Sequence, residues 1–270
     1  MIESSKTSDI LVDVPAAGLV RITINRPQKH NALARPVLDA LASAVRAAAD
    51  DHQTRCIMLR GAGNKYFAAG GDLVDLAAVR TDEEIDAMGA QATAALDAVR
   101  ECAVPVVAFV NGDALGGGAE LAVACDMRIM APHARIGFIQ GRMGITSAWG
   151  GGPDLCTLIG PARAMRMMAR CEMIGAEVAV AWGLADLRAT GDADGEDVAA
   201  FMKPMLERSG LVVRGIKAQT LACRHGLPRA PRREVERRHL ISTWASAEHW
   251  AAVDRFLARG TQMSPNEDKK

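Results

Sequence analysis

Residues 106–121 read VVAFVNGDALGGGAEL, and the expected fold and site both start from this stretch. The apolar run 106–110 is typical of a buried strand, and the glycines at 116–118 lead into a segment with helical character. Glycine lets a ligand approach the backbone closely, and the first N–H groups of a helix lack intrahelical acceptors. Because the helix dipole also favours negative charge at this end, the stretch predicts a site that holds an oxyanion.

Gly117 and Glu120 are three residues apart, so they share one face of a helix that begins near the glycines. This spacing places a carboxylate beside the bare N–H groups, where it can transfer a proton. The competing interpretation is a tight turn followed by a glutamate that the helix dipole merely stabilises. A phosphate-binding loop fits poorly, because no Lys followed by Ser or Thr comes after the glycines and residues 112–118 do not give G-x-G-x-x-G.

Composition restricts the class of partner. A chain of 270 residues with 49% hydrophobic residues can bury a sizeable core. Basic and acidic residues number 32 each, so no net field draws the protein to nucleic acid or to an anionic membrane. Aromatic residues make up 4% of the chain, too few for base-stacking platforms. We therefore expect a small diffusible partner, with no nucleic acid and no membrane.

The six cysteines form no C-x-x-C pair, and His30, His133 and His249 lack metal-ligand spacing. We expect reduced thiols and no metal. Residues 1–9 lack the apolar core of a secretory signal, and no apolar run reaches the length of a membrane span. The sequence therefore predicts a cytoplasmic protein.

Strand and helix patterns alternate along the first two thirds of the chain. Strands are expected at 19–24, 56–59, 106–110 and 127–130; helices from Pro36, from the Thr81–Glu84 capping box to about residue 100, and near 153, 161 and 176; and a glycine-bearing loop at 61–71. This alternation predicts an α/β core with parallel strands. From about residue 196 onward only helical patterns remain. The arginines near 232–238 fit a solvated face, and a phosphate or partner contact is the alternative.

Four segments together resemble the crotonase superfamily, the enoyl-CoA hydratase/isomerase family. They are NRP and NAL within 25–33, FAAGGDL at 67–73, the NGxxxGGGxEL pattern at 111–121, and AEVAVAWGLAD at 176–186. Their order and spacing are similar to the family's along nearly the whole chain. The resemblance implies an α/β spiral of repeated ββα units over 1–195 that binds acyl-CoA. It also implies a helical region over 196–270 for oligomerisation and pocket closure, in a homotrimer or a dimer of trimers.

The resemblance also implies a site for acyl-CoA thioesters, in which coenzyme A enters with the substrate and no separate cofactor is needed. The N–H groups of Gly71 and Gly117 would form the oxyanion hole, and Glu120 would transfer the proton. Further substrate-binding positions carried over from the family motifs are Ala32, Lys65, Ala69, Gly70, Asp72, Leu73 and Gly116. Lys65 resembles a lysine that contacts the CoA phosphate, although a plain surface lysine is the alternative.

The chain departs from the hydratase pattern at one position. The second glutamate of the family's hydratases would fall at Gln140, and the residues 138–145 contain no carboxylate. A neutral amide cannot act as a base, so hydration through two carboxylates would be impaired, and family isomerases match imperfectly for the same reason.

Residues 138–144, with Trp149-Gly150-Gly151, are similar to the ethylmalonyl-CoA decarboxylase-like branch of the superfamily. Decarboxylation starts without a base, so Glu120 would serve as the single acid while Gln140 orients the substrate or a water. The expected function is an acyl-CoA lyase, with decarboxylation of an alkylmalonyl-CoA-type substrate as the first choice. Enoyl-CoA hydration or isomerisation is the alternative, and a non-catalytic CoA-binding protein is the alternative of another class.

Overall fold

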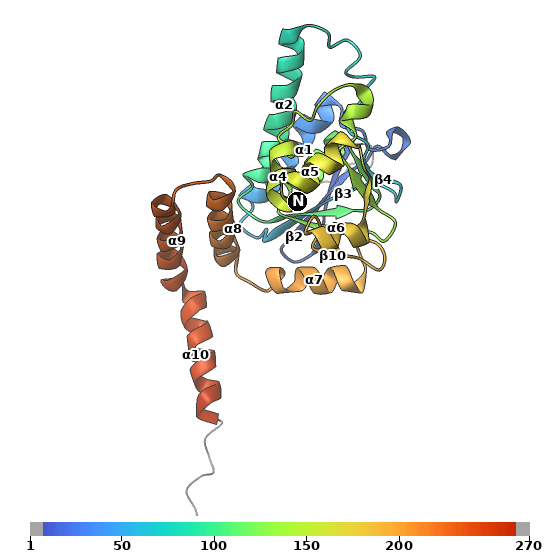
Figure 1. Cartoon of the computed structure of the whole chain (residues 1–270). Coiled ribbons are helices and arrows are strands. Elements are labelled where there is room, and N and C mark those ends of the chain that lie inside the picture. Colours follow the sequence, from blue (N-terminus) through green and yellow to red (C-terminus); the bar gives the residue numbers. More distant parts are fainter. Residues whose placement is uncertain (1–7, 263–270) are drawn as a thin grey trace, which may run out of the picture. The chain divides into compact units, whose positions relative to one another are not determined.

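The structure, a computed structural model, describes residues 8–262, and the side chains of residues 8–258. The chain divides after Glu207 into two compact units (Figure 1).

Two sheets form the framework of the first unit. The larger has six strands in the order β1 (Ile10–Ala16), β2 (Leu19–Ile24), β3 (Cys56–Gly61), β5 (Val106–Val110), β7 (Met127–Met130) and β10 (Leu187–Arg188). All its neighbours pair in parallel except β1 with β2. The smaller has four strands in the order β4 (Tyr66–Ala68), β6 (Asp113–Leu115), β8 (Arg135–Gly137) and β9 (Ile174–Gly175).

A strand-strand-helix unit repeats along the chain. The three clearest repeats are β3 and β4 with α2 (Asp82–Arg100), β5 and β6 with α3 (Gly117–Ala124), and β7 and β8 with α4 (Gly151–Ile159). In each repeat the first strand joins the larger sheet and the second joins the smaller. The expected α/β spiral of ββα units is thereby confirmed.

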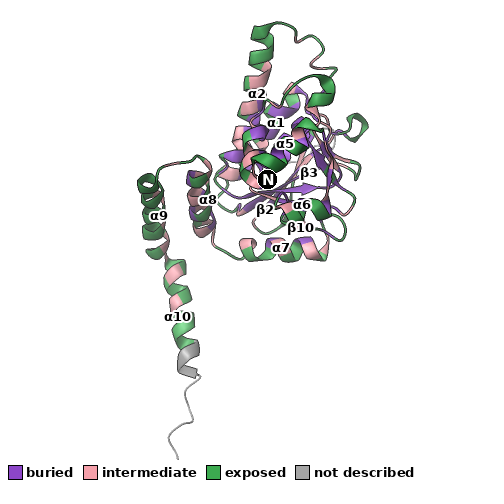
Figure 2. Ribbon diagram, in the orientation of Figure 1, coloured by how far each residue is buried: buried purple, intermediate pink, exposed green. Residues whose placement is uncertain are grey.

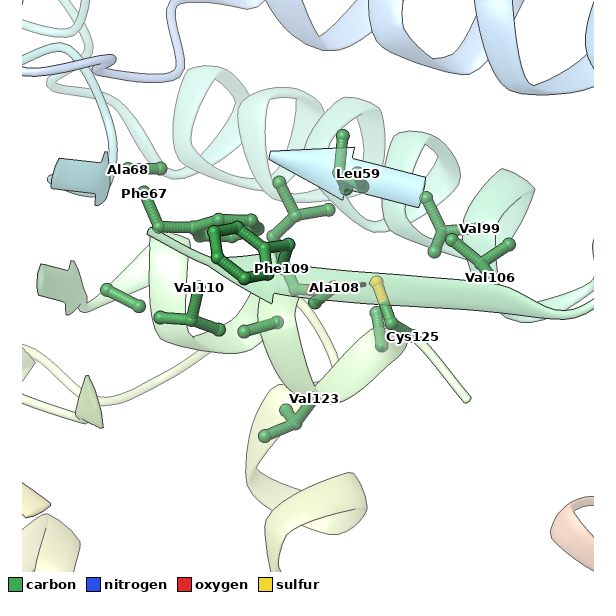
Figure 3. Close-up of a cluster of buried hydrophobic side chains, with 14 of the residues drawn as sticks. Leu59, Phe67, Ala68, Val99, Val106, Ala108, Phe109, Val110, Val123 and Cys125 are labelled. Atoms are coloured by element: carbon green, nitrogen blue, oxygen red, sulfur yellow. Dashed lines mark hydrogen bonds between the residues drawn. The ribbon is translucent and has the colours of Figure 1, made fainter. Parts of the chain in front are cut away.

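The central strand β5 explains why residues 106–110 are apolar throughout. It lies between β3 and β7, and all five of its residues are buried. A parallel strand covered on both faces reads as a continuous apolar run. Figure 3 shows Phe109 and Val110 in a buried cluster that also contains Leu59 from β3, Phe67 from β4 and Val123 from α3.

Local signals placed several helices correctly. The helix expected from Pro36 is α1 (Arg35–Asp50), which buries one apolar face. The capping box that begins α2 is present: the Glu84 N–H donates to Thr81 Oγ1 at 3.2 Å, and the Thr81 N–H donates to Glu84 Oε2 at 3.1 Å. The short helices expected near 153, 161 and 176 are α4, α5 (Pro161–Ala169) and α6 (Ala176–Trp182).

Short strands were missed. The segment 61–71 is not only a loop, because it contains β4, and the stretch 106–121 holds a second strand, β6, between β5 and the glycines. Each of these strands has three residues, too few to show a period of two. The strand β1 was also not expected. Two 3-10 turns, η1 (Pro27–Lys29) and η2 (Gln140–Met143), complete the irregular parts near the site.

The C-terminal helical region begins with α7 (Glu196–Leu206), as expected from the sequence. This helix, however, belongs to the first unit. The second unit contains α8 (Gly210–Arg224), α9 (Arg229–Trp244) and α10 (Ala247–Gln262), with α8 packed on α9. No residue of α9 is buried, and its arginines are exposed, as Figure 2 shows in green.

Within residues 8–262, no helix is both long and apolar enough to cross a membrane. All six cysteines are free thiols.

Candidate active site

Two glycine loops lie side by side and present bare N–H groups. Gly70 and Gly116 adopt positive φ angles of 94° and 53°, which glycine tolerates best. A Cβ atom on Gly70 would lie 3.3 Å from the nitrogen of Gly117, so the loops touch at their backbones. Over the described part of the chain, no hydrogen-bond acceptor meets the N–H of Gly71 or of Gly117. The two glycines expected as oxyanion donors therefore lie in adjacent loops.

A bridge to Leu33 sets the direction of the Gly71 N–H. The Leu33 N–H donates to the Gly70 carbonyl at 2.8 Å, and the Asp72 N–H donates to the Leu33 carbonyl at 3.3 Å. Because successive residues of an extended chain point their N–H groups to opposite sides, the Gly71 N–H faces away from Leu33.

A buried ion pair anchors the same loop. Arg26 and Asp72 lie 2.9 Å apart, and both are largely buried. Arg26 also donates to the Ala32 carbonyl at 2.6 Å, and Asp72 accepts from the Val74 N–H at 3.1 Å. Burial acts to raise the pKa of Asp72, but the hydrogen bonds from Arg26 and the loop backbone together lower that pKa below its ordinary value. The Asp72 carboxylate, expected to bind substrate, contacts protein groups and holds Gly71 in place.

Two asparagines of the family-like motifs fix the turn between β3 and β4. Asn111 accepts from the Gly61 N–H at 2.8 Å, and Asn31 donates to the Tyr66 carbonyl at 2.8 Å. Both side chains are buried. Their role is to satisfy backbone groups of a turn that has few partners of its own.

Glu120 is buried in the first turn of α3, with 2% of its surface exposed. Its Oε1 atom accepts from the N–H of Trp149 at 2.9 Å and from that of Gly151 at 3.1 Å. Its Oε2 atom accepts from Nε2 of Gln140 at 2.9 Å. The carboxylate thus lies at the beginning of α4 and contacts Gln140, the residue expected to orient the substrate or a water.

Burial raises the pKa of Glu120 above its ordinary value of 4.5. Hydrogen bonds from Trp149, Gly151 and Gln140, together with the positive charge of Arg100, lower the pKa in part without cancelling this effect. A carboxyl group with a raised pKa holds its proton at higher pH, which suits a proton donor.

Trp149 forms the wall beside both glycines, a role the sequence did not reveal. A Cβ atom on Gly117 would lie 2.2 Å from Cζ3 of the indole, and one on Gly71 would lie 3.6 Å from Cη2. The indole is buried, with 7% of the residue exposed. Trp149 therefore packs its ring against Gly71 and Gly117 and donates its backbone N–H to Glu120.

Arg100 was also missed. It lies at the end of α2 and donates to the Trp149 carbonyl and to Asp154 Oδ2, each at 2.8 Å. The sequence offered one signal that Arg100 is buried: it lies four residues after Leu96, on the apolar face of α2.

The remaining expected positions are more scattered. Ala69 and Gly70 lie in the first glycine loop, and Gly116 donates its N–H to the Gly137 carbonyl at 2.9 Å. Lys65 and Leu73 are exposed. Among the described residues, no group of three or more His, Cys, Asp or Glu side chains could hold a metal ion.

Comparison with known proteins identifies the class. The family model described as Enoyl-CoA hydratase/isomerase matches residues 15–263. The chain is 34% identical to a crotonyl-CoA hydratase of Syntrophomonas wolfei over 202 residues, which is 74% of this chain and 76% of that protein. It is 29% identical to an ethylmalonyl-CoA decarboxylase of Xenopus laevis over 249 residues, covering 91% and 81% of the two chains.

A solved enoyl-CoA hydratase from Bacillus anthracis superposes with a TM-score of 0.87 at 26% identity, covering 93% of this chain and 97% of that one. The protein therefore belongs to the enoyl-CoA hydratase/isomerase family and has the crotonase fold. Members of this family named as hydratase and as decarboxylase are both similar to it.

Proposed function

We propose that the protein is an enzyme that stabilises the enolate of an acyl-CoA thioester. The N–H groups of Gly71 and Gly117 bind the thioester oxygen, and each such donor lowers the barrier by about 3 kcal/mol when it is aimed at the developing charge. Glu120, one helical turn beyond Gly117, transfers a proton to or from a substrate carbon. The adjacency of the two glycine loops and the raised pKa of Glu120 support these roles.

The first-choice reaction is decarboxylation of an alkylmalonyl-CoA-type substrate. The bond from the α-carbon to the carboxylate breaks, carbon dioxide leaves, and the electron pair forms the enolate. The α-carbon then takes a proton from Glu120, which solvent reprotonates. The observation that carries this choice is the amide of Gln140 at 2.9 Å from Glu120, where a second carboxylate would repel the substrate carboxylate.

Gln140 suits both protonation states of Glu120. Its NH₂ group donates to the ionised carboxylate, as the structure has it. After a half-turn of the amide, its carbonyl oxygen accepts the proton of the neutral acid. Gln140 thus keeps a hydrogen bond to Glu120 before and after proton transfer.

Hydration of an enoyl-CoA is the second candidate, and isomerisation shares its imperfect fit. The observation that favours hydration is the 34% identity to a protein named as a crotonyl-CoA hydratase. In this reaction Glu120 would have to serve without a second carboxylate at position 140.

Parallel incubations with ethylmalonyl-CoA and with crotonyl-CoA test the choice. We expect carbon dioxide and butyryl-CoA from the first and little hydration of the second. Rapid hydration of crotonyl-CoA without release of carbon dioxide would overturn the first choice. Binding of several CoA thioesters with no turnover of any would instead support a non-catalytic CoA-binding protein.

The homotrimer or dimer of trimers, the role of the C-terminal helices in oligomerisation and pocket closure, and the cytoplasmic location stay predictions. So does the absence of a separate cofactor.

A further inference from the structure

The guanidinium of Arg100 joins three backbone and side-chain acceptors. Besides the Trp149 carbonyl and Asp154 on α4, it binds Asp97 Oδ1 at 2.8 Å. The arginine is buried, with 7% of its surface exposed. It therefore connects the end of α2 to the segment that leads into α4.

The main chain of Trp149 is held at both of its polar groups. Its carbonyl accepts from Arg100 at 2.8 Å, and its N–H donates to Glu120 Oε1 at 2.9 Å. Gly150 follows with a positive φ of 85°, and a Cβ atom on it would lie 2.7 Å from Nη2 of Arg100. The guanidinium thus packs directly on the backbone between the two N–H groups that bind Glu120.

We propose that Arg100 is a positioning residue, which holds the main chain of residues 149–151 so that two N–H groups fix Oε1 of Glu120 while Oε2 faces Gln140. The inference deepens the proposed function and rests on it, since it assumes that Glu120 transfers the proton. Nothing in it depends on whether the reaction is decarboxylation or hydration.

The charge of Arg100 adds a second effect on Glu120. The arginine lowers the pKa of Glu120, against the larger effect of burial. The titratable and charged groups on the helices and strands packed against α3 are Asp82, Glu83, Glu84, Asp86, Asp97, Arg100 and the adjoining Glu101 of α2, Asp154 and Cys156 of α4, Tyr66 of β4, Asp113 of β6 and Arg128 of β7. Of these, Arg100 is the one whose charge acts on Glu120 among the main causes of its shift.

A purely structural role for the ion pair between Arg100 and Asp154 predicts a different result from a positioning role. If Arg100 only ties α2 to α4 through Asp154, its loss would lower stability and leave the titration of Glu120 unchanged. If it positions Glu120, both the titration and the turnover number change.

The variants Arg100→Gln and Arg100→Lys separate charge from geometry. Gln keeps a donor for the Trp149 carbonyl but has no charge, whereas Lys keeps the charge but cannot donate in two fixed directions. The titration of Glu120 is followed by infrared difference spectra of the protonated carboxyl band, with Glu120→Gln as the blank. This reading needs no substrate.

We expect the titration midpoint to rise in Arg100→Gln and to stay near wild type in Arg100→Lys. Both variants should lower kcat by about 10- to 100-fold with a smaller change in KM, because misplacing a reacting group costs rate more than binding. Unchanged midpoint and kcat in Arg100→Gln would overturn the proposal. If that variant does not fold, an unchanged kcat in Arg100→Lys would overturn it.

Two controls match the change. Asp97→Asn removes the half-exposed partner of Arg100 and keeps its bond to Trp149, so the midpoint should not move. Arg128→Gln removes another buried guanidinium, which binds the carbonyls of Leu184 and Cys125, and should leave the midpoint unchanged. Full activity of Glu120→Gln would refute the proposed function, whereas the infrared titration would still report on Arg100.

Discussion

Gln140 donates its amide to Oε2 of Glu120 across 2.9 Å, although the two residues lie 20 positions apart in the chain. The other carboxylate oxygen accepts two backbone N–H groups, so every polar partner of Glu120 found at hydrogen-bond distance in the described part of the chain is a neutral donor. A site built in this way stabilises one ionisable group in either of its states. It suits a reaction in which one carboxyl group carries one proton.

Replacing Glu120 by Gln removes the proton but keeps the shape of the side chain. Gln140 can turn its amide to accept from the new NH₂ group, so the hydrogen bonds survive. We expect kcat to fall by about 10²- to 10⁴-fold, the usual contribution of a general acid or base, with little change in affinity for a CoA thioester. Steady-state kinetics and calorimetric titration measure the two effects.

The control for this variant is Glu177→Gln, which changes an exposed glutamate in the first turn of α6. It should leave turnover unchanged. Wild-type turnover in Glu120→Gln would show that Glu120 only anchors the start of α4.

The raised pKa of Glu120 also predicts how stability depends on pH. Because burial raises the pKa above the ordinary value of 4.5, the folded chain binds this proton more tightly than the unfolded chain. The stability contributed by the protonated group is complete below the unfolded value and is lost as the pH rises through the folded value. Relative to Glu120→Gln, the wild-type free energy of unfolding should therefore fall with rising pH, by at most about 1.4 kcal/mol per unit. Urea unfolding of both proteins over a pH series measures the difference, and a rise with pH would contradict the sign.

Elements with a local cause could be predicted from the sequence. The strand 106–110 is a continuous apolar run, and α2 begins at a capping box formed by Thr81 and Glu84. The strands β4 and β6 could not be predicted because three residues show no periodicity. Their pairing is set by partners far along the chain.

The site residues also separate into those that local motifs predicted and those that depend on distant contacts. The motifs around Gly71 and Gly117 led to the proposed oxyanion donors, and the family spacing led to Gln140. Trp149 and Arg100 were missed because their roles come from contacts across 29 and 49 positions, which no local pattern records.

Replacing Gln140 by Glu should move the enzyme away from decarboxylation. Two carboxyl groups within hydrogen-bond distance cannot both ionise easily, and the new charge repels a substrate carboxylate. We expect release of carbon dioxide from ethylmalonyl-CoA to fall by about 10-fold or more and hydration of crotonyl-CoA to rise, since an acid-base group is worth at least about 100-fold. Gln140→Ala, which removes the amide without adding charge, should lose some decarboxylation and gain no hydration. A faster decarboxylation in Gln140→Glu would refute the role given to the neutral amide.

The contact between Gly117 and Trp149 predicts a rescue. A Cβ atom on Gly117 would lie 2.2 Å from Cζ3 of the buried indole, so Gly117→Ala should cost about 1–3 kcal/mol of stability through overpacking. In a Trp149→Ala background the ring is gone and the cost should largely disappear, which a double-mutant cycle in urea measures as coupling. Gly118→Ala is the matched control, because its Cβ would lie 2.0 Å from the Ala68 carbonyl oxygen, which Trp149→Ala does not remove. Equal rescue of both glycine variants would show that loosening of the whole site, and not the indole contact, explains the effect.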